Sequence, residues 1–153
     1  MADERREDAG RTRSRTDYRY FLAIATRWMD NDVYGHVNNV TYYSYFDTVV
    51  NEHLIRAGGL DIVADPAIGV VVETGCVFRR SLSFPEIIDA GLVVTKLGRS
   101  SVVYEIALFR QGDDDAAALG RFVHVWVDRV SQRPVPIPAR IRAALEPLVV
   151  APL

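Results

Sequence analysis

The feature that most constrains the fold is a single stretch of helical periodicity, at residues 38–57, in a chain that otherwise has the pattern of β-strands. Apolar side chains recur in it at spacings of three and four residues, which predicts one long helix of about 18 residues with one apolar face. Asn38 stands at the N-cap position, and Gly58 and Gly59 end the pattern. The face comprises Val40, Tyr43, Phe46 or Asp47, Val50, Leu54 and Ala57. A single such helix can bury its apolar face only against a broad surface, such as a sheet.

The rest of the chain predicts that sheet. In residues 18–26, a period of two places Tyr18, Tyr20, Leu22 and Ile24 on one face of a strand. Four more strands are predicted at 67–79, 87–97, 101–110 and 119–130, and a short helix at 139–148. Three prolines between residues 134 and 138 end the sheet, because proline cannot donate a ladder hydrogen bond. This order of elements indicates an α+β fold in which an antiparallel sheet curls around the helix.

Length and charge set the domain organisation. The 153 residues suffice for one domain. Residues 1–17 are rich in charge and poor in large apolar side chains, so they are predicted to form a disordered tail before a folded domain at 18–153. The net charge of -2 gives no general attraction to nucleic acid or anionic membranes.

A cytoplasmic location is expected from what the chain lacks. Cys76 is the only cysteine, so no intramolecular disulfide can form, which fits a reducing compartment. No apolar run approaches the roughly 18 residues of a membrane span, and the N-terminus has no signal-peptide core.

The polar loop before the helix carries the residues that suggest chemistry. It reads Asp30-Asn-Asp32-Val-Tyr-Gly35-His36-Val-Asn38-Asn39. A helix N-terminus offers unpaired N–H groups and partial positive charge where an oxyanion would develop. A carboxylate just before it can act as a base toward water or attack a carbonyl itself. Gly35 allows a tight loop, Asp30 is expected to be structural and to pair with Arg27, and His36 is expected to order the loop.

The segment from Arg27 to Asp47 resembles the opening signature of hotdog-fold thioesterases of the 4-hydroxybenzoyl-CoA thioesterase type. Weaker similarity extends to the Gly98–Ser101 turn and to residues 133–138. The resemblance implies a hotdog fold, with Asp32 as the catalytic carboxylate and the backbone N–H of Asn39 polarising the thioester carbonyl. The candidate substrate contacts around them are Gly35, His36, Asn38 and Tyr43.

Other residues stay open as the catalytic acid. A sibling branch of these thioesterases carries its acid on the central helix. The predicted helix here contains two acids, Asp47 and Glu52, so Asp47 is a second candidate after Asp32. Glu73, on a predicted strand, could face the cleft of a neighbouring subunit. Cys76 lies in an apolar strand, where a buried and inert thiol is usual. The three histidines lack the spacing of a zinc site, so no metal or other cofactor is expected.

The resemblance also indicates the partners. The substrate would be an acyl-CoA or an acyl-carrier-protein thioester, and the phosphates of CoA call for cations at the mouth of the site. The candidates are Arg79, Arg80, Arg99 and Arg133. A homodimer or homotetramer is expected, because one helix cannot cover the sheet edges. Two rival functions remain, a hydro-lyase on the same fold and a non-catalytic acyl-thioester binding protein.

Overall fold

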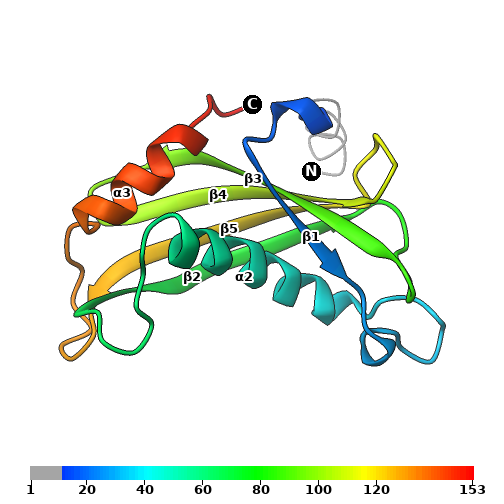
Figure 1. Ribbon diagram of the computed structural model, residues 1–153, viewed down its shortest axis with the longest axis horizontal. Helices are drawn as coiled ribbons and strands as arrows, with labels where there is room; N and C mark the ends of the chain where they lie inside the picture. The colour runs from blue at the N-terminus through cyan, green and yellow to red at the C-terminus, as the bar shows by residue number, and fades with distance from the viewer. Residues whose placement is uncertain (1–11) are drawn as a thin grey trace, which may run out of the picture.

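The computed structural model describes residues 12–153 as one antiparallel sheet with a long helix packed against one face (Figure 1). The sheet has five strands in the order β1-β3-β4-β5-β2. The strands are β1 (Tyr20–Ala25), β2 (Ala67–Phe78), β3 (Ile87–Leu97), β4 (Ser101–Arg110) and β5 (Ala118–Asp128). The helices are α2 (Asn39–Arg56) and the short α3 (Ala139–Leu145). This arrangement confirms the predicted α+β fold.

Helix α2 begins and ends where its sequence predicts. The Asn38 side chain accepts a hydrogen bond from the Val40 N–H at 3.0 Å, and Gly59 takes a positive φ of 65° after the last turn. The face that packs on the sheet is rotated from the predicted one, because Val40 and Ala57 are exposed. The buried residues of α2 are Tyr42, Tyr45, Phe46, Val49, Val50, His53 and Leu54.

Helix and sheet approach each other closely at Gly120 of β5. A Cβ atom at this position would lie 2.5 Å from Cζ of Phe46 on α2, well inside van der Waals contact. The aromatic ring therefore lies directly on the bare backbone of β5. Phe46 is fully buried in the main core between α2 and the sheet.

A second, smaller apolar cluster covers the outer face of the sheet, away from α2. It contains Tyr18, Val93, Ala107 and Phe109. Tyr18 was predicted to share a face with Tyr20, but it precedes β1 and packs edge-on against Phe109, with ring centroids 5.9 Å apart. The prediction is wrong because the strand alternation starts only at Tyr20.

Part of the predicted tail is docked on this outer face. The Arg13 guanidinium binds Glu105 of β4 at 2.9 Å and the carbonyl of Ala151 at 2.7 Å. Arg15 binds Asp89 at 2.8 Å and lies over the ring of Phe109. Residues 12–17 of the predicted tail therefore contact the sheet through their arginines, whereas disorder of the tail as a whole stays a prediction. Residues 1–11 of the predicted tail lie outside the described residues.

The two edges of the sheet differ in how they are covered. At one edge, β1 crosses in front of α2 in Figure 1, and its Tyr20 hydroxyl binds Glu52 of the helix. At the other edge, β2 pairs only with β5 and exposes Val72 and Val77 by 58% and 59%. No helix within residues 12–153 has both the length and the hydropathy needed to cross a membrane.

Candidate active site

The loop between β1 and α2 is held in a defined shape by its own backbone. The Asp32 N–H donates to the His36 carbonyl at 2.9 Å, and the Gly35 N–H donates to the Asp32 carbonyl at 3.0 Å. Gly35 closes this turn with a φ of 81°, a conformation that L side chains rarely adopt. The expected role of Gly35 is therefore present. His36 orders the loop, but it does so through its carbonyl rather than through its ring.

A second segment, residues 81–84, locks this loop against the sheet. The Val37 N–H donates to the Leu82 carbonyl at 2.7 Å, and the Phe84 N–H donates to the Asn31 side chain at 3.1 Å. The Ser83 hydroxyl donates to the Gly35 carbonyl at 3.2 Å. The loop thus has contacts on both sides of Asp32, which fix the position of this residue.

Asp30 has the structural role that its sequence context predicts. Its carboxylate is 2% exposed and accepts hydrogen bonds from the Tyr45 hydroxyl at 2.7 Å, the Arg27 N–H at 2.9 Å and the Arg27 guanidinium. Burial acts to raise the pKa of Asp30, but the hydrogen bonds from Tyr45 and Arg27 and the Arg27 charge hold that pKa below its ordinary value. Asp30 is thus a buried anion that ties the loop to α2.

Asp32 lies in a different environment, two residues further on. It is half-buried, and one carboxylate oxygen accepts a hydrogen bond from the Tyr34 N–H at 2.8 Å. Among the residues that the structure describes, the other oxygen has no hydrogen-bond donor. That oxygen is available to a water molecule or a substrate.

The N-terminus of α2 presents one unpaired N–H group. The Asn38 N–H donates to the Asp30 carbonyl, and the Val40 and Thr41 N–H groups donate to Asn38. The Asn39 N–H has no acceptor within residues 12–153. It lies at the positive end of the helix dipole, where a developing negative charge is stabilised.

Asp32 and Asn39 line one cavity of about 360 Å³. His36, Arg79 and Arg80 line it as well, so five of the residues singled out from the sequence come together here. The cavity combines a carboxylate, a helix N-terminus and two guanidinium groups. Such a set can hold an anionic substrate and stabilise an oxyanion beside a base.

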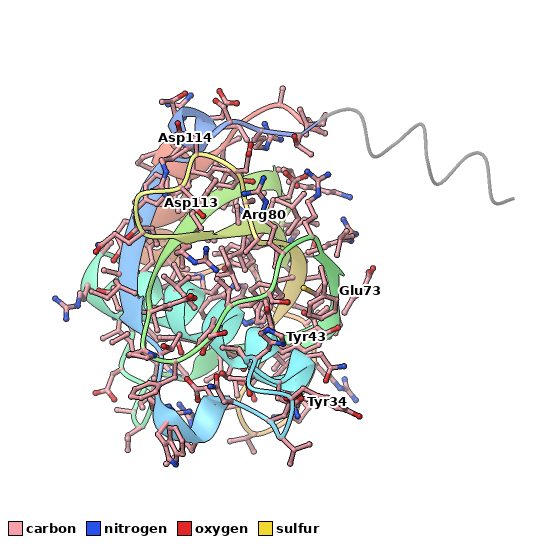
Figure 2. The ribbon with its side chains drawn as sticks, turned by 90° about the vertical axis from the view of Figure 1, so that its right-hand side faces the viewer. Tyr34, Tyr43, Glu73, Arg80, Asp113 and Asp114 are labelled. Atoms are coloured by element: carbon pink, nitrogen blue, oxygen red, sulfur yellow. The ribbon has the colours of Figure 1, made fainter. Side chains whose placement is uncertain are left out.

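Other predicted contacts lie elsewhere. Gly35 and Asn38 shape the loop and the helix cap, and neither lines the cavity. Tyr43 lies half-exposed against Phe46 and is placed in Figure 2 beside Tyr34 and Glu73, on the side where β2 lies.

Arg99 and Arg133 do not line this cavity. Arg99 is in the β3–β4 turn, where its carbonyl accepts a hydrogen bond from the Ile137 N–H. Arg133 follows β5 and its carbonyl pairs with Asp128. Both lie at the end of the sheet opposite the loop of Asp32, because antiparallel strands carry successive turns to alternate ends (Figure 1).

The alternative acids do not line the cavity. Asp47 is exposed on α2, and partial loss of water around its carboxyl group raises its pKa. Glu52 binds Tyr20 and Arg56, and the exposed Glu73 pairs with Arg121 across the β2–β5 ladder at 3.2 Å. Burial raises the pKa of Cys76 to about 11, so the thiol form dominates at neutral pH. Within residues 12–153, no group of three metal-ligating side chains comes together.

Four wall residues were missed from the sequence, namely Val37, Tyr42, Phe78 and Ser81. The Tyr42 ring meets Phe78 edge-on with centroids 4.9 Å apart, and Ser81 completes this side of the cavity. The Tyr42 hydroxyl accepts a hydrogen bond from the Leu82 N–H at 3.3 Å. Tyr42 could have been found, because it is one helical turn after Asn39 and therefore on the same face of α2.

An antiparallel five-stranded sheet on one long helix, with a carboxylate beside the helix N-terminus, defines a thioesterase-like protein of the hotdog fold. Residues 26–145 match the family described as Thioesterase-like superfamily, and the chain belongs to this family. The expected family and fold are thereby confirmed.

Solved structures of other proteins have the same fold. The PA5185 protein of Pseudomonas aeruginosa strain PAO1 is 54% identical, with a TM-score of 0.88 over 89% of this chain and 95% of that one. The PA2801 protein of Pseudomonas aeruginosa, titled as a candidate thioesterase, is 30% identical, with a TM-score of 0.78 over 83% and 98%. BH1999 gentisyl-coenzyme A thioesterase, at 22% identity, shares the fold with a TM-score of 0.73 over 82% and 99%. A comparison with curated protein sequences gives no match.

Proposed function

We propose that this protein hydrolyses an acyl-CoA thioester to a carboxylic acid and free CoA, with Asp32 as the catalytic carboxylate. The observation that carries the proposal is that Asp32 and the unpaired N–H of Asn39 line the same cavity. A thioester carbonyl that accepts a hydrogen bond from Asn39 would lie in the cavity to which the open oxygen of Asp32 belongs. This is the relation that acyl transfer to water requires.

Asp32 alone can make both proton transfers that the hydrolysis needs. As a general base, Asp32 takes a proton from water while the water oxygen forms a bond to the carbonyl carbon. The oxyanion is stabilised by the Asn39 N–H and the dipole of α2. Its collapse breaks the carbon–sulfur bond, and the CoA thiolate takes the proton from Asp32. As a nucleophile, Asp32 would instead attack the carbonyl and expel the CoA thiolate, which leaves a mixed anhydride. Water then hydrolyses the anhydride to the acid and the Asp32 carboxylate, and its proton goes to the thiolate.

Arg79 and Arg80 are proposed to bind the phosphates of CoA. Both line the cavity with Asp32, and both follow the last residue of β2. A guanidinium group matches phosphate in shape and charge, so the pair would hold the nucleotide end at the mouth. The printed names of PA2801 and BH1999 favour thioester substrates, and the second names a coenzyme A thioester.

A homodimer or homotetramer is proposed for the assembly. The β2 edge carries unpaired backbone groups along 12 residues, with exposed valines on it. The last residue of this strand, Phe78, and the two arginines after it line the cavity of Asp32. A second copy at this edge would therefore lie beside the candidate site.

The function is tested by measuring free thiol release from a panel of acyl-CoA and acyl-carrier-protein thioesters, aliphatic and aromatic. Hydrolysis of at least one acyl-CoA, with an equivalent amount of acid formed, is the expected result. Hydration or dehydration without thiol release would favour the hydro-lyase. Binding without any reaction would favour an acyl-thioester binding protein. Thiol release from the carrier-protein substrates alone would show that acyl carrier protein, and not CoA, carries the acyl group.

A further inference from the structure

The β4–β5 loop, residues 111–117, borders a second basin next to the candidate active site. This basin has a volume of about 550 Å³, and its lining includes Arg13, Arg79, Arg80, Asp114 and Asp115. Arg79 and Arg80 line both the basin and the cavity of Asp32. Figure 2 shows Arg80 beside the loop that carries Asp113 and Asp114. The two arginines thus lie between the candidate active site and an acidic loop.

Backbone contacts hold the two arginines and the loop together. The N–H groups of Arg79 and Arg80 both donate to the carbonyl of Ala117, at 2.9 and 3.0 Å. Two residues before Ala117, the Asp115 carboxylate accepts a hydrogen bond from the Arg80 guanidinium at 2.9 Å. Arg79 makes no side-chain ion pair within residues 12–153. The loop is therefore anchored where one of its acids reaches Arg80 and none reaches Arg79.

We propose that Asp115 binds the Arg80 guanidinium in the free protein, where a phosphate of the substrate would otherwise bind. Asp115 thereby lowers the affinity of the site for the nucleotide end of CoA. The inference rests on the proposed function and deepens it by naming a specificity-determining residue. Asp115 offers Arg80 the same charged acceptor that a phosphate oxygen offers. Binding of the phosphate then requires that the Arg80–Asp115 pair opens.

The exposure of the pair makes this exchange feasible. The side chains of Arg80 and Asp115 are 55% and 75% exposed, so solvent screens their attraction and the pair opens at low cost. A phosphate carries more charge than a carboxylate and would displace Asp115. Asp114, on the same loop and facing the same basin, has no ion-pair partner within residues 12–153. The acids therefore weaken phosphate binding by competition at Arg80 and by like-charge repulsion.

The test is the affinity of Asp115→Asn for free CoA and for pantetheine, which lacks the nucleotide, by calorimetry at low salt. CoA should bind about 2- to 5-fold more tightly than to the wild type, the size of a surface ion pair, and pantetheine should bind equally well. Asp114→Asn removes the same charge without freeing Arg80, and should give a smaller gain. In Arg80→Gln, the further change Asp115→Asn should have no more effect than Asp114→Asn.

The affinity for CoA and the rate of thiol release are measured independently, so the two proposals can fail separately. An absence of thiol release by the wild type would overturn the function, whereas CoA affinities would still report on Asp115. Unchanged or weaker CoA binding by Asp115→Asn would overturn the inference while leaving hydrolysis intact. An equal gain for pantetheine, or a gain that persists in the Arg80→Gln background, would overturn it as well.

Discussion

Two aspartates only two residues apart have opposite environments at the start of α2. Asp30 is buried and accepts hydrogen bonds at both of its oxygens from Arg27 and Tyr45. Asp32 is half-buried, and its single hydrogen bond leaves one oxygen open to the cavity. A carboxylate with all its acceptor sites filled stabilises a loop, whereas one with a free oxygen can bind water. The two residues should therefore differ in what their loss affects.

Asp32→Asn should lower kcat by roughly 10²-fold or more, the scale of a lost general base. Its volume is nearly unchanged, and its oxygen can still accept from the Tyr34 N–H, so KM and the free energy of unfolding should change little. Steady-state kinetics of thiol release and urea unfolding measure the two effects. A folded Asp32→Asn variant with near wild-type turnover would contradict the assignment and make Asp47 or Glu73 the next residue to test.

The control for that variant is Asp30→Asn. It places an NH₂ group among the donors of Arg27 and Tyr45 and removes the buried charge that pairs with the guanidinium. The Arg27 guanidinium is 62% exposed, so the main cost is the disruption of the buried hydrogen bonds to Asp30, about 1–3 kcal/mol. Asp30→Asn should therefore lower the free energy of unfolding, with any rate loss following from the disturbed loop.

His124 predicts a pH dependence of stability. It is buried beside Tyr104, Phe122 and Trp126, and burial lowers its pKa from 6.5 to about 4. Between these pH values the unfolded chain binds a proton that the native state does not, so this contribution is complete above pH 6.5 and falls as the pH drops toward 4. Urea unfolding at pH 7.5 and 5.0 should show a loss of about 2 kcal/mol. His124→Leu should lack this loss, and an equal loss in that variant would contradict the prediction.

At the scale of single residues, local chemistry was predictable and contacts over long distances were not. The pairing of Arg27 with Asp30 and the cap by Asn38 depend on neighbours in the sequence, and both are present. The helical spacing from Asn39 could have indicated Tyr42, but its contacts with Phe78 and Leu82 join residues about 40 positions apart. Sequence spacing carries no information about such contacts until the strands are placed.

At the scale of elements, the position of α2 on the sheet depends on one residue without a side chain. Gly120→Ala would place a Cβ atom 2.5 Å from Phe46, which can move only by displacing the core. We expect a loss of about 1–3 kcal/mol in the free energy of unfolding, measured by urea titration. Phe46→Leu should recover part of this loss in the double variant, because the two positions are in contact.

Gly75→Ala is the matched control on the neighbouring strand. Gly75 pairs with Arg121 in the β2–β5 ladder, and a Cβ atom there would have no heavy atom within 4 Å. Its substitution should change the free energy of unfolding by less than about 0.5 kcal/mol. Equal losses for Gly75→Ala and Gly120→Ala would show that the effect is one of strand backbone rather than of helix packing.

The strands and helices themselves were predictable because their patterns are local. The third and fourth strands, residues 87–97 and 101–110, have the predicted bounds, and the others differ by one or two residues. The orientation of α2 about its own axis was less predictable. The buried residues of α2 lie on a face turned away from Val40, so this apolar residue remains exposed. The helix period alone does not show which of several overlapping apolar faces packs on the sheet.

At the scale of the whole molecule, the strand directions decide which arginines can act together. Arg79 and Arg80 leave β2 at the end where α2 begins, and they line the cavity of Asp32. Arg99 leaves β3, which runs antiparallel, at the opposite end. The linear sequence shows only that each lies near a strand end. Sorting them requires the order and direction of all five strands.

The last prediction is that the protein forms a homo-oligomer through the free edge of β2. This edge exposes backbone groups and apolar side chains, including Val72, that a second copy would cover. Light scattering at micromolar concentration should give at least twice the chain mass of 17.1 kDa. Val72→Lys should shift the mass toward the monomer and lower turnover, because the site lies beside this edge. Val130→Lys, at a valine that is 90% exposed in the turn after β5, should change neither. A monomeric wild type with full thioesterase activity would contradict both the assembly and its role in the site.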